Sequence, residues 1–206
     1  MKYLILIFAC ACIAFGITMT IQVSELGLEP WGAAHIGLAN YVYTVGTWTA
    51  IYQLLLLSIN FFLDKKLPRF GTLLCILCLG PFIDFFIYLN ITPLTDSYFL
   101  KWLQFFLGII IACFGAALSI TTNLGSSPKT QCYVTIAAAF QIPLFMAKML
   151  LELTGLLTAL IVGGPIFIGT LFFVFLTGPI VQWQYTQLQR VKGKFSNLKQ
   201  LKKRTA

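Results

Sequence analysis

The chain has 206 residues, of which 59% are hydrophobic and 10% charged, and its mean hydropathy is +0.88. Soluble domains usually carry about 25% charged residues, so this composition excludes a water-soluble fold. Seven basic residues after position 189 supply most of the net charge of +8, which therefore indicates a basic tail and not a nucleic-acid-binding surface. They are Arg190, Lys192, Lys194, Lys199, Lys202, Lys203 and Arg204.

Six apolar runs are long enough to cross the roughly 30 Å hydrocarbon layer of a membrane as helices. They occupy residues 3–23, 44–63, 70–88, 101–121, 143–162 and 166–186. The sequence therefore predicts an all-α, multi-pass membrane protein with six transmembrane helices. Two shorter and more polar segments, 31–42 and 129–140, lie between these runs. The sequence leaves open whether they re-enter the membrane, span it to give eight spans, or lie at its surface.

Basic residues gather on one side of a six-span chain, and the positive-inside rule assigns that side to the cytoplasm. Lys2, the loop 64–69, Lys129 and the basic tail all fall there. We therefore expect both termini to be cytoplasmic. Tryptophans are expected in belts at the two membrane boundaries. Those near the outer boundary are Trp31, Trp48 and Trp102, and Trp183 is near the inner one.

The two halves of the chain share a pattern of glycines and prolines. At an offset of 99, Lys2, Leu4, Phe15 and Gly16 match Lys101, Leu103, Phe114 and Gly115. At an offset of 98, Leu26-Gly27-x-x-Pro30 matches Leu124-Gly125-x-x-Pro128, Gly71-Thr72 matches Gly169-Thr170, and Gly80-Pro81 matches Gly178-Pro179. Few other residues meet the backbone demands of glycine and proline, so these matches indicate a tandem duplication. Three spans in each half predict inverted repeats at 1–98 and 99–188, followed by a basic cytoplasmic tail at 189–206.

Each Leu-Gly-x-x-Pro motif predicts a helix, a break and a second helix. Gly27 and Gly125 suit the residue that ends a helix, and Pro30 and Pro128 suit the first turn of the next. If the second helix dips back into the bilayer, its N-terminus presents unpaired N–H groups, and broken helices at matching positions point to a transporter site. The alternative is a surface turn that leads into an interfacial helix.

Charged residues inside spans are costly and are therefore functional candidates. Three exist, Asp84, Lys148 and Glu152, and the last two share a helix face at i, i+4 spacing, where they can pair. The sequence leaves open whether they form a structural pair or bind a substrate or proton. The predicted substrate-binding set is Gly27, Pro30, Gly125, Pro128, Asp84, Lys148 and Glu152.

The sequence contains no catalytic constellation. His35 is the only histidine and is expected to be solvated or interfacial, and Glu29 is expected to be an ordinary loop carboxylate or part of a vestibule. Cys75-x-x-Cys78 lacks the two further ligands that a tetrahedral metal site needs. We therefore expect packing cysteines, no metal, no cofactor and no enzymatic activity. Apolar and basic residues alternate over 181–201, which predicts contact with anionic lipid.

The chain resembles the YczE-type bacterial integral membrane proteins, which are distant relatives of the YitT group. The resemblance rests on Phe15-Gly16, Leu26-Gly27-x-x-Pro30-Trp31, Gly71-Thr72 and Gly80-Pro81-x-x-Asp84. Family members often have Asp after the first Pro-Trp, where this chain has Gly32, and the second half has Lys129 in place of the Trp. The resemblance implies a bacterial plasma-membrane protein with a permease-like or regulatory role.

Two functions follow from these patterns. The first is a small permease with an alternating-access site for a small molecule between the two Leu-Gly-x-x-Pro breaks. The second is a non-transporting membrane scaffold or regulator that acts through a partner. The sequence identifies neither the substrate nor the coupling ion, and it leaves homo-oligomers open.

Overall fold

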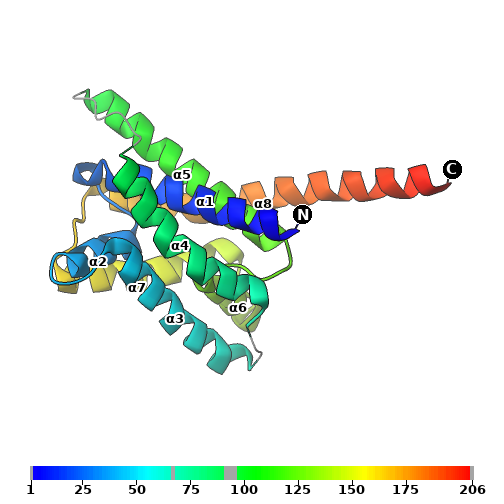
Figure 1. The fold of residues 1–206 in the computed structure, drawn as a ribbon, viewed down its shortest axis with the longest axis horizontal. Coiled ribbons are helices and arrows are strands. Elements are labelled where there is room, and N and C mark those ends of the chain that lie inside the picture. Colours follow the sequence, from blue (N-terminus) through cyan, green and yellow to red (C-terminus); the bar gives the residue numbers. More distant parts are fainter. Residues whose placement is uncertain (1, 66–67, 91–96, 205–206) are drawn as a thin grey trace.

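The computed structural model describes residues 2–65, 68–90 and 97–204, and for Asp64 and residues 193–204 only the backbone. These ranges contain helices and no strand, which confirms the all-α prediction (Figure 1). The elements are α1 (Lys2–Ile21), η1 (Ser24–Leu26), α2 (Pro30–Ala39), α3 (Val45–Asp64), α4 (Phe70–Leu89), α5 (Tyr98–Thr121), α6 (Pro128–Phe140), α7 (Leu144–Val162) and α8 (Ile168–Arg204). Lys66 of the predicted basic loop lies outside the described residues.

Five of these helices are long and apolar enough to cross a membrane, namely α1, α3, α4, α5 and α7. They coincide with the first five predicted spans. The sixth predicted span, 166–186, falls in α8, which is not among the five because polar residues such as Gln182 and Gln184 lower its hydropathy. The count of six spans therefore stays a prediction. The α8 helix continues to Arg204 and extends past the rest of the bundle (Figure 1).

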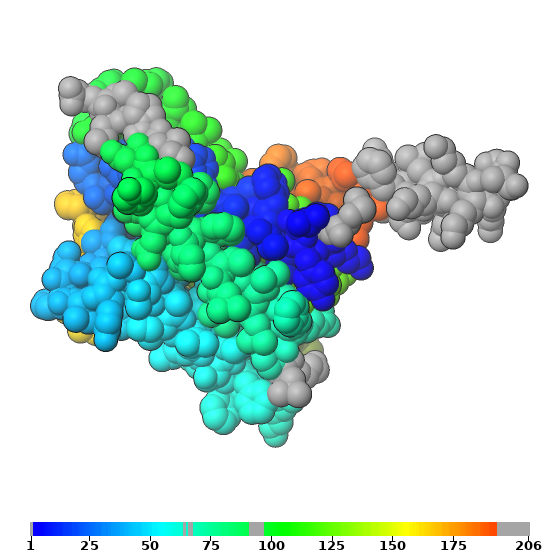
Figure 2. Space-filling view, viewed as in Figure 1, coloured from blue at the N-terminus to red at the C-terminus, as the bar shows by residue number. Residues whose placement is uncertain are grey.

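Large apolar side chains are exposed on the outer faces of the bundle. Leu77 on α4 is 71% exposed, Phe62 on α3 is 77% exposed and Ile161 on α7 is 84% exposed. Figure 2 shows the face that α1 to α4 form. Contiguous apolar surface on this scale is unfavourable in water, whereas lipid tails solvate it. The exterior is therefore that of a membrane protein.

The α1 and α5 helices cross in close contact because both carry glycine at the crossing. A Cβ atom added to Gly16 would lie 2.5 Å from the carbonyl oxygen of Gly108, and one added to Gly115 would lie 2.5 Å from that of Ala9. Gly16 and Gly115 are 99 residues apart, as are Ala9 and Gly108. The same positions of the two halves thus make the crossing. Helices in membranes approach this closely only where small residues face each other.

Both Leu-Gly-x-x-Pro motifs form the predicted break. Gly27 has φ +117° and Gly125 has φ +111°, and Pro30 and Pro128 each occupy the first turn of the next helix. A side chain at either glycine would be strained in this backbone region. The two breaks therefore have the same local geometry.

The short helices that follow the breaks lie inside the bundle. The 10 residues of α2 and the 13 residues of α6 give lengths of about 15 and 20 Å at 1.5 Å per residue. Both are too short to span the roughly 30 Å hydrocarbon layer. The α2 helix packs against α7 and α3, and the α6 helix packs against α3 and α7. Each short helix therefore contacts both α3 and α7.

We expect Gly115→Val to destabilise the protein by about 1–3 kcal/mol or more, because the added methyl groups meet the α1 backbone, which cannot move aside. Thermal unfolding of the protein in detergent measures this change. Ile110→Phe is the matched control, since it adds bulk to α5 at a side chain that is 45% exposed. An equal loss of stability in both variants would contradict the close crossing.

Candidate functional site

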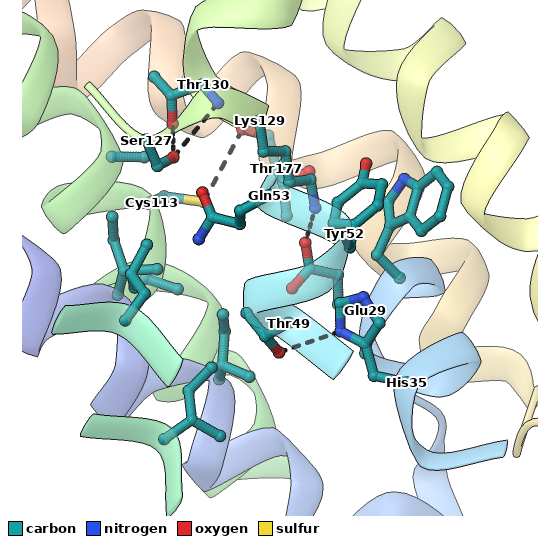
Figure 3. A pocket seen from close by; sticks show the side chains of 18 of the residues that line it. Glu29, His35, Thr49, Tyr52, Gln53, Cys113, Ser127, Lys129, Thr130 and Thr177 are labelled. Atoms are coloured by element: carbon teal, nitrogen blue, oxygen red, sulfur yellow. Dashed lines mark hydrogen bonds and ion pairs between the residues drawn. The ribbon is translucent and has the colours of Figure 1, made fainter. Parts of the chain in front are cut away.

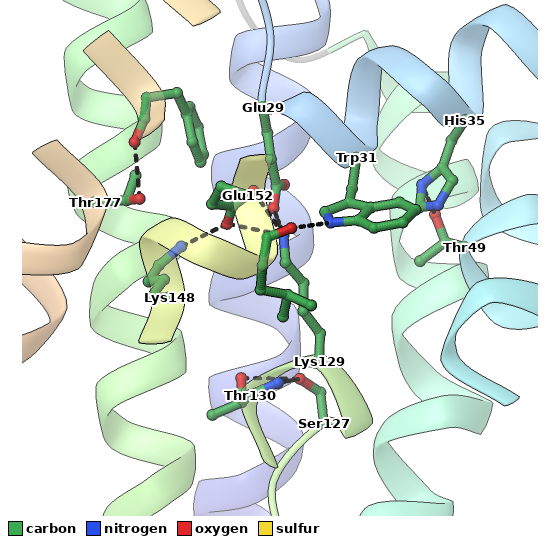
Figure 4. Close-up of polar contacts among 12 residues, drawn as sticks. Glu29, Trp31, His35, Thr49, Ser127, Lys129, Thr130, Lys148, Glu152 and Thr177 are labelled. Atoms are coloured by element: carbon green, nitrogen blue, oxygen red, sulfur yellow. Dashed lines mark hydrogen bonds and ion pairs between the residues drawn. The ribbon is translucent and has the colours of Figure 1, made fainter. Parts of the chain in front are cut away.

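The two breaks bring four charged side chains together in the interior of the bundle (Figure 4). Glu29 is the N-cap residue of α2, and its carboxylate forms an ion pair with the Lys129 ammonium from the first turn of α6. Lys129 Nζ also lies 3.1 Å from Glu152 Oε1, and Lys148 Nζ lies 2.7 Å from the same oxygen. The ion pairs therefore form a continuous chain in the order Glu29, Lys129, Glu152, Lys148. We refer to these four residues as the charge chain.

The charge chain is neutral, and three of its members are buried, whereas the Lys129 side chain is 18% exposed. Glu152 is fully buried, Lys148 is 7% exposed and Glu29 is 8% exposed. Taking an ion out of water costs several kcal/mol, and partners offset that cost only when every charge has one. Here each carboxylate faces an ammonium and each ammonium faces a carboxylate. Glu29 is the one member from the first half, so its pair with Lys129 joins the two halves.

A cavity of about 90 Å³ lies against the charge chain (Figure 3). Glu29, Lys129 and Lys148 line the cavity, whereas Glu152 does not. The rest of the wall is largely apolar, from Ile13 and Ile17 on α1, Leu79 and Ile83 on α4, and Phe173 and Val181 on α8. The cavity therefore has a charged side and an apolar side.

Most lining residues fall into pairs that are 98 or 99 positions apart. These pairs are Ile13/Ala112, Ile17/Ala116, Glu29/Ser127, Trp31/Lys129, Gly32/Thr130, His35/Tyr133, Leu79/Thr177 and Ile83/Val181. The two offsets are those that match the glycines and prolines in the sequence. Residues at this spacing therefore surround one cavity.

Four buried polar atoms of cavity-lining residues have no hydrogen-bond partner in the described chain. They are His35 Nε2, the Tyr52 hydroxyl, Gln53 Oε1 and the Tyr133 hydroxyl. The other ring nitrogen of His35, Nδ1, lies 3.2 Å from Thr49 Oγ1. Tyr52 stacks on Trp31 with ring centroids 3.9 Å apart, and the Trp31 indole N–H donates to the Leu151 carbonyl at 3.0 Å. Buried polar groups are nearly always satisfied, so these four atoms indicate a place for water or a polar ligand.

Burial also lowers the pKa of two residues on the short helices. It lowers the pKa of His35 to about 4, so the ring is neutral at pH 7. Burial lowers the pKa of Lys129 to about 8, against the opposing attraction of Glu152. Lys129 therefore remains mostly protonated at pH 7, as its ion pairs require.

The structure separates the sequence-predicted site residues into three groups. Lys148 and Glu152 form the predicted ion pair and belong to the charge chain. Gly27, Pro30, Gly125 and Pro128 shape the two breaks that carry Glu29 and Lys129. Asp84 lies apart from the cavity lining and accepts hydrogen bonds from the Thr44 hydroxyl at 2.8 Å and the Gly46 N–H at 3.0 Å. Asp84 therefore binds the start of α3.

Three residues expected on the outer side of the membrane line the cavity, namely Glu29, Trp31 and His35. The expectation of a solvated or interfacial His35 was wrong, because His35 is 6% exposed. For Glu29, a position on the cavity wall agrees with the vestibule alternative. The common reason is that α2 turns back into the bundle, so residues assigned to the outer boundary are in the interior. Lys129, assigned to the cytoplasmic surface, is in the interior for the same reason, on α6.

Sequence analysis missed Glu29, Lys129, Tyr52, Gln53 and Tyr133 as cavity residues. A usable signal was present for one of them. The 98-residue offset carries His35 to Tyr133. Extending the repeat from glycines and prolines to polar residues would have drawn attention to Tyr133.

The cysteines show packing contacts. Cys10 Sγ lies 3.3 Å from Cys75 Sγ in the buried contact between α1 and α4, and both thiols are free. Within the part of the chain that the structure describes, no group of three or more His, Cys, Asp and Glu residues could hold a metal ion.

Comparison with known proteins places this architecture in a family. Residues 1–186 match DUF6198, a family of unknown function. The chain is 31% identical to the uncharacterized membrane protein YczE of Bacillus subtilis over 85% of this chain and 81% of that protein. It is 30% identical to the uncharacterized protein YyaS of Bacillus subtilis over 88% of this chain and 90% of that protein. An uncharacterized protein of Haemophilus influenzae is 27% identical over 87% of this chain and 81% of its own length. No solved structure matches the chain significantly.

We expect Glu152→Gln to destabilise the protein by about 3–5 kcal/mol, because it leaves two ammonium groups without their shared carboxylate. Thermal unfolding in detergent gives this value. Glu25→Gln is the matched control, since the Glu25 side chain is 52% exposed and its ion pair with Lys101 is worth about 0–1 kcal/mol. A loss for Glu152→Gln no larger than that of the control would show that the charge chain carries no buried charge.

Proposed function

We propose that the chain, which belongs to the DUF6198 family of unknown function, is a small permease with its substrate site at the cavity between the two helix breaks. The charge chain is the observation that carries this proposal. Ionisable groups inside a membrane protein are expensive and are usually retained for function. Apolar residues of similar size would hold the helices together at lower cost.

Inverted repeats would give this site its mechanism. The proposal places α2 as a hairpin-like segment entering from one side of the membrane and α6 as its counterpart from the other, so that their N-termini meet in the middle. The pairing of lining residues at offsets of 98 and 99 supports this arrangement. One half could then rock against the other around the cavity and open it to each side in turn. We place both termini in the cytoplasm on the positive-inside pattern.

The competing function is a scaffold or regulator that acts through a partner or an anionic leaflet. The observation in its favour is that α8 continues as one helix past the bundle (Figure 1). Its basic side chains from Lys194 onward lie outside the described side chains. The cavity and its charges have no role in this alternative, so tests of the cavity separate the two functions.

The inverted arrangement predicts that the ends of α2 and α6 face opposite sides of the membrane. Tyr41 follows α2 and is 81% exposed, and Gln141 follows α6 and is also exposed. In a background without the native cysteines, we expect an impermeant thiol reagent to label Tyr41→Cys in intact cells and Gln141→Cys only in inverted vesicles. Labelling of both from the same side would contradict the inverted repeat.

Alternating access predicts that a cavity residue is reached from both sides. Cys113 lines the cavity, so a variant that retains only this native cysteine reports on it. We expect a small impermeant thiol reagent to modify Cys113 in intact cells and in inverted vesicles, because the cavity opens to each side in turn. A variant retaining only Cys12, which lies on α1 outside the cavity lining, is the matched control and should react from neither side. Modification of Cys113 from one side alone would indicate a fixed vestibule and not a permease.

A further inference from the structure

We infer that the cavity binds a small zwitterion with a short apolar substituent, such as an aliphatic α-amino acid. The inference rests on the proposed permease function and names the class of its substrate. It follows from the charge of the site, from the polar groups left unsatisfied there, and from the apolar wall.

The neutrality of the charge chain restricts the charge of the ligand. Glu29, Lys129 and Lys148 reach the cavity, and every charge already has a partner. A ligand with a single charge would leave one buried charge unpaired, which is costly in a site shielded from water. A ligand without charges could not replace either member of the Glu29–Lys129 pair. A zwitterion can enter this pair with its ammonium on Glu29 and its carboxylate on Lys129, so all charges stay paired.

The groups around this pair suit the same ligand. The α2 helix has 10 residues and no side-chain cap at its N-terminus, so the N–H groups of its first turn are free to bind a carboxylate. A Cβ atom at Gly32, in that first turn, would meet only the Glu29 Cβ atom at 3.7 Å, which leaves space beside the backbone. The unpartnered His35 Nε2 and Tyr52 hydroxyl lie at the same cavity and supply further hydrogen bonds. These atoms are independent of the charge argument.

The opposite wall limits the substituent. Side chains from α1, α4 and α8 make it apolar, so burying a methyl or isopropyl group there is favourable. A long polar side chain would lose its hydration against this wall without gaining polar partners from Ile13, Ile17, Leu79 and Ile83. An amino acid with a short aliphatic side chain fits both walls.

Four compounds that each carry an isopropyl group test the inference on the purified full chain in lipid nanodiscs. L-valine carries both charges, isobutylamine carries the positive charge, isovalerate carries the negative charge, and isobutanol carries neither. We expect L-valine to bind about a hundredfold more tightly than the other three, the ratio typical of leaving a buried charge unpaired. Isothermal titration measures the four dissociation constants. Equal or tighter binding of isovalerate, or of inorganic phosphate, would overturn the inference in favour of an anion site.

If the zwitterion enters the Glu29–Lys129 pair, two variants should change which of the four compounds binds most tightly. Glu29→Gln leaves the site with one excess positive charge, so L-valine should bind more weakly and isovalerate should become the preferred ligand. In Lys129→Gln isobutylamine should become the preferred ligand. The double variant Glu29→Gln with Lys129→Gln leaves no unpaired charge at this contact, should fold, and should bind none of the charged compounds. Glu25→Gln, four residues from Glu29 and outside the cavity lining, should retain L-valine binding.

Uptake of radiolabelled L-valine into proteoliposomes separates this inference from the permease function. Binding in nanodiscs together with uptake supports both. Binding without uptake supports the ligand class and contradicts the permease function. Labelling of Cys113 from both sides without binding of L-valine contradicts the ligand class and supports the permease function.

Discussion

The need to give every buried charge a partner is the constraint on which this structure depends. The Lys129 ammonium lies between Glu29 and Glu152, so one side chain connects the start of α2, the start of α6 and the middle of α7. Without these ion pairs the charged residues at the starts of the two short helices would have no partners in an apolar interior. Each break ends a long helix and starts a short helix inside the bundle. The breaks therefore place these charged side chains where they contact each other. Local backbone geometry and long-range electrostatics therefore support the same arrangement.

The apolar part of the bundle permits this arrangement. Gly16 and Gly115 let α1 and α5 cross with their backbones in contact. The cavity lies next to this crossing, with Ile13 and Ala112 on its wall. Elsewhere the two halves are joined by polar contacts to the breaks themselves, such as the Asn60 amide that donates to the Pro128 carbonyl at 2.9 Å and the Leu28 N–H that donates to Thr170 Oγ1 at 3.1 Å. The breaks are therefore held by the helices of the opposite half.

Sequence reasoning predicted the parts of this structure that depend on local patterns. Long apolar runs became helices, and Gly27 and Gly125 became breaks, because hydropathy and backbone preference act over a few residues. The Lys148–Glu152 pair was predictable because i, i+4 neighbours share a helix face. The depth of α2 and α6 was not predictable, since a short semi-polar helix has the same composition at a membrane surface and in a bundle interior. The positions of Glu29, Trp31 and Lys129 depend on that depth, so they were assigned to surfaces.

The pairing of cavity residues has a consequence for how such a site could arise. The 98-residue offset pairs Glu29 with Ser127 and Lys129 with Trp31, and it carries Lys148 to Ala50 and Glu152 to Leu54. Every charge thus corresponds to a neutral residue in the other half. A symmetric dimer of either half would place like residues opposite each other: copies of the second half would bring four lysines and two glutamates together, and copies of the first half would bring two unpaired glutamates. Balanced charge therefore requires two different halves, and this chain supplies both.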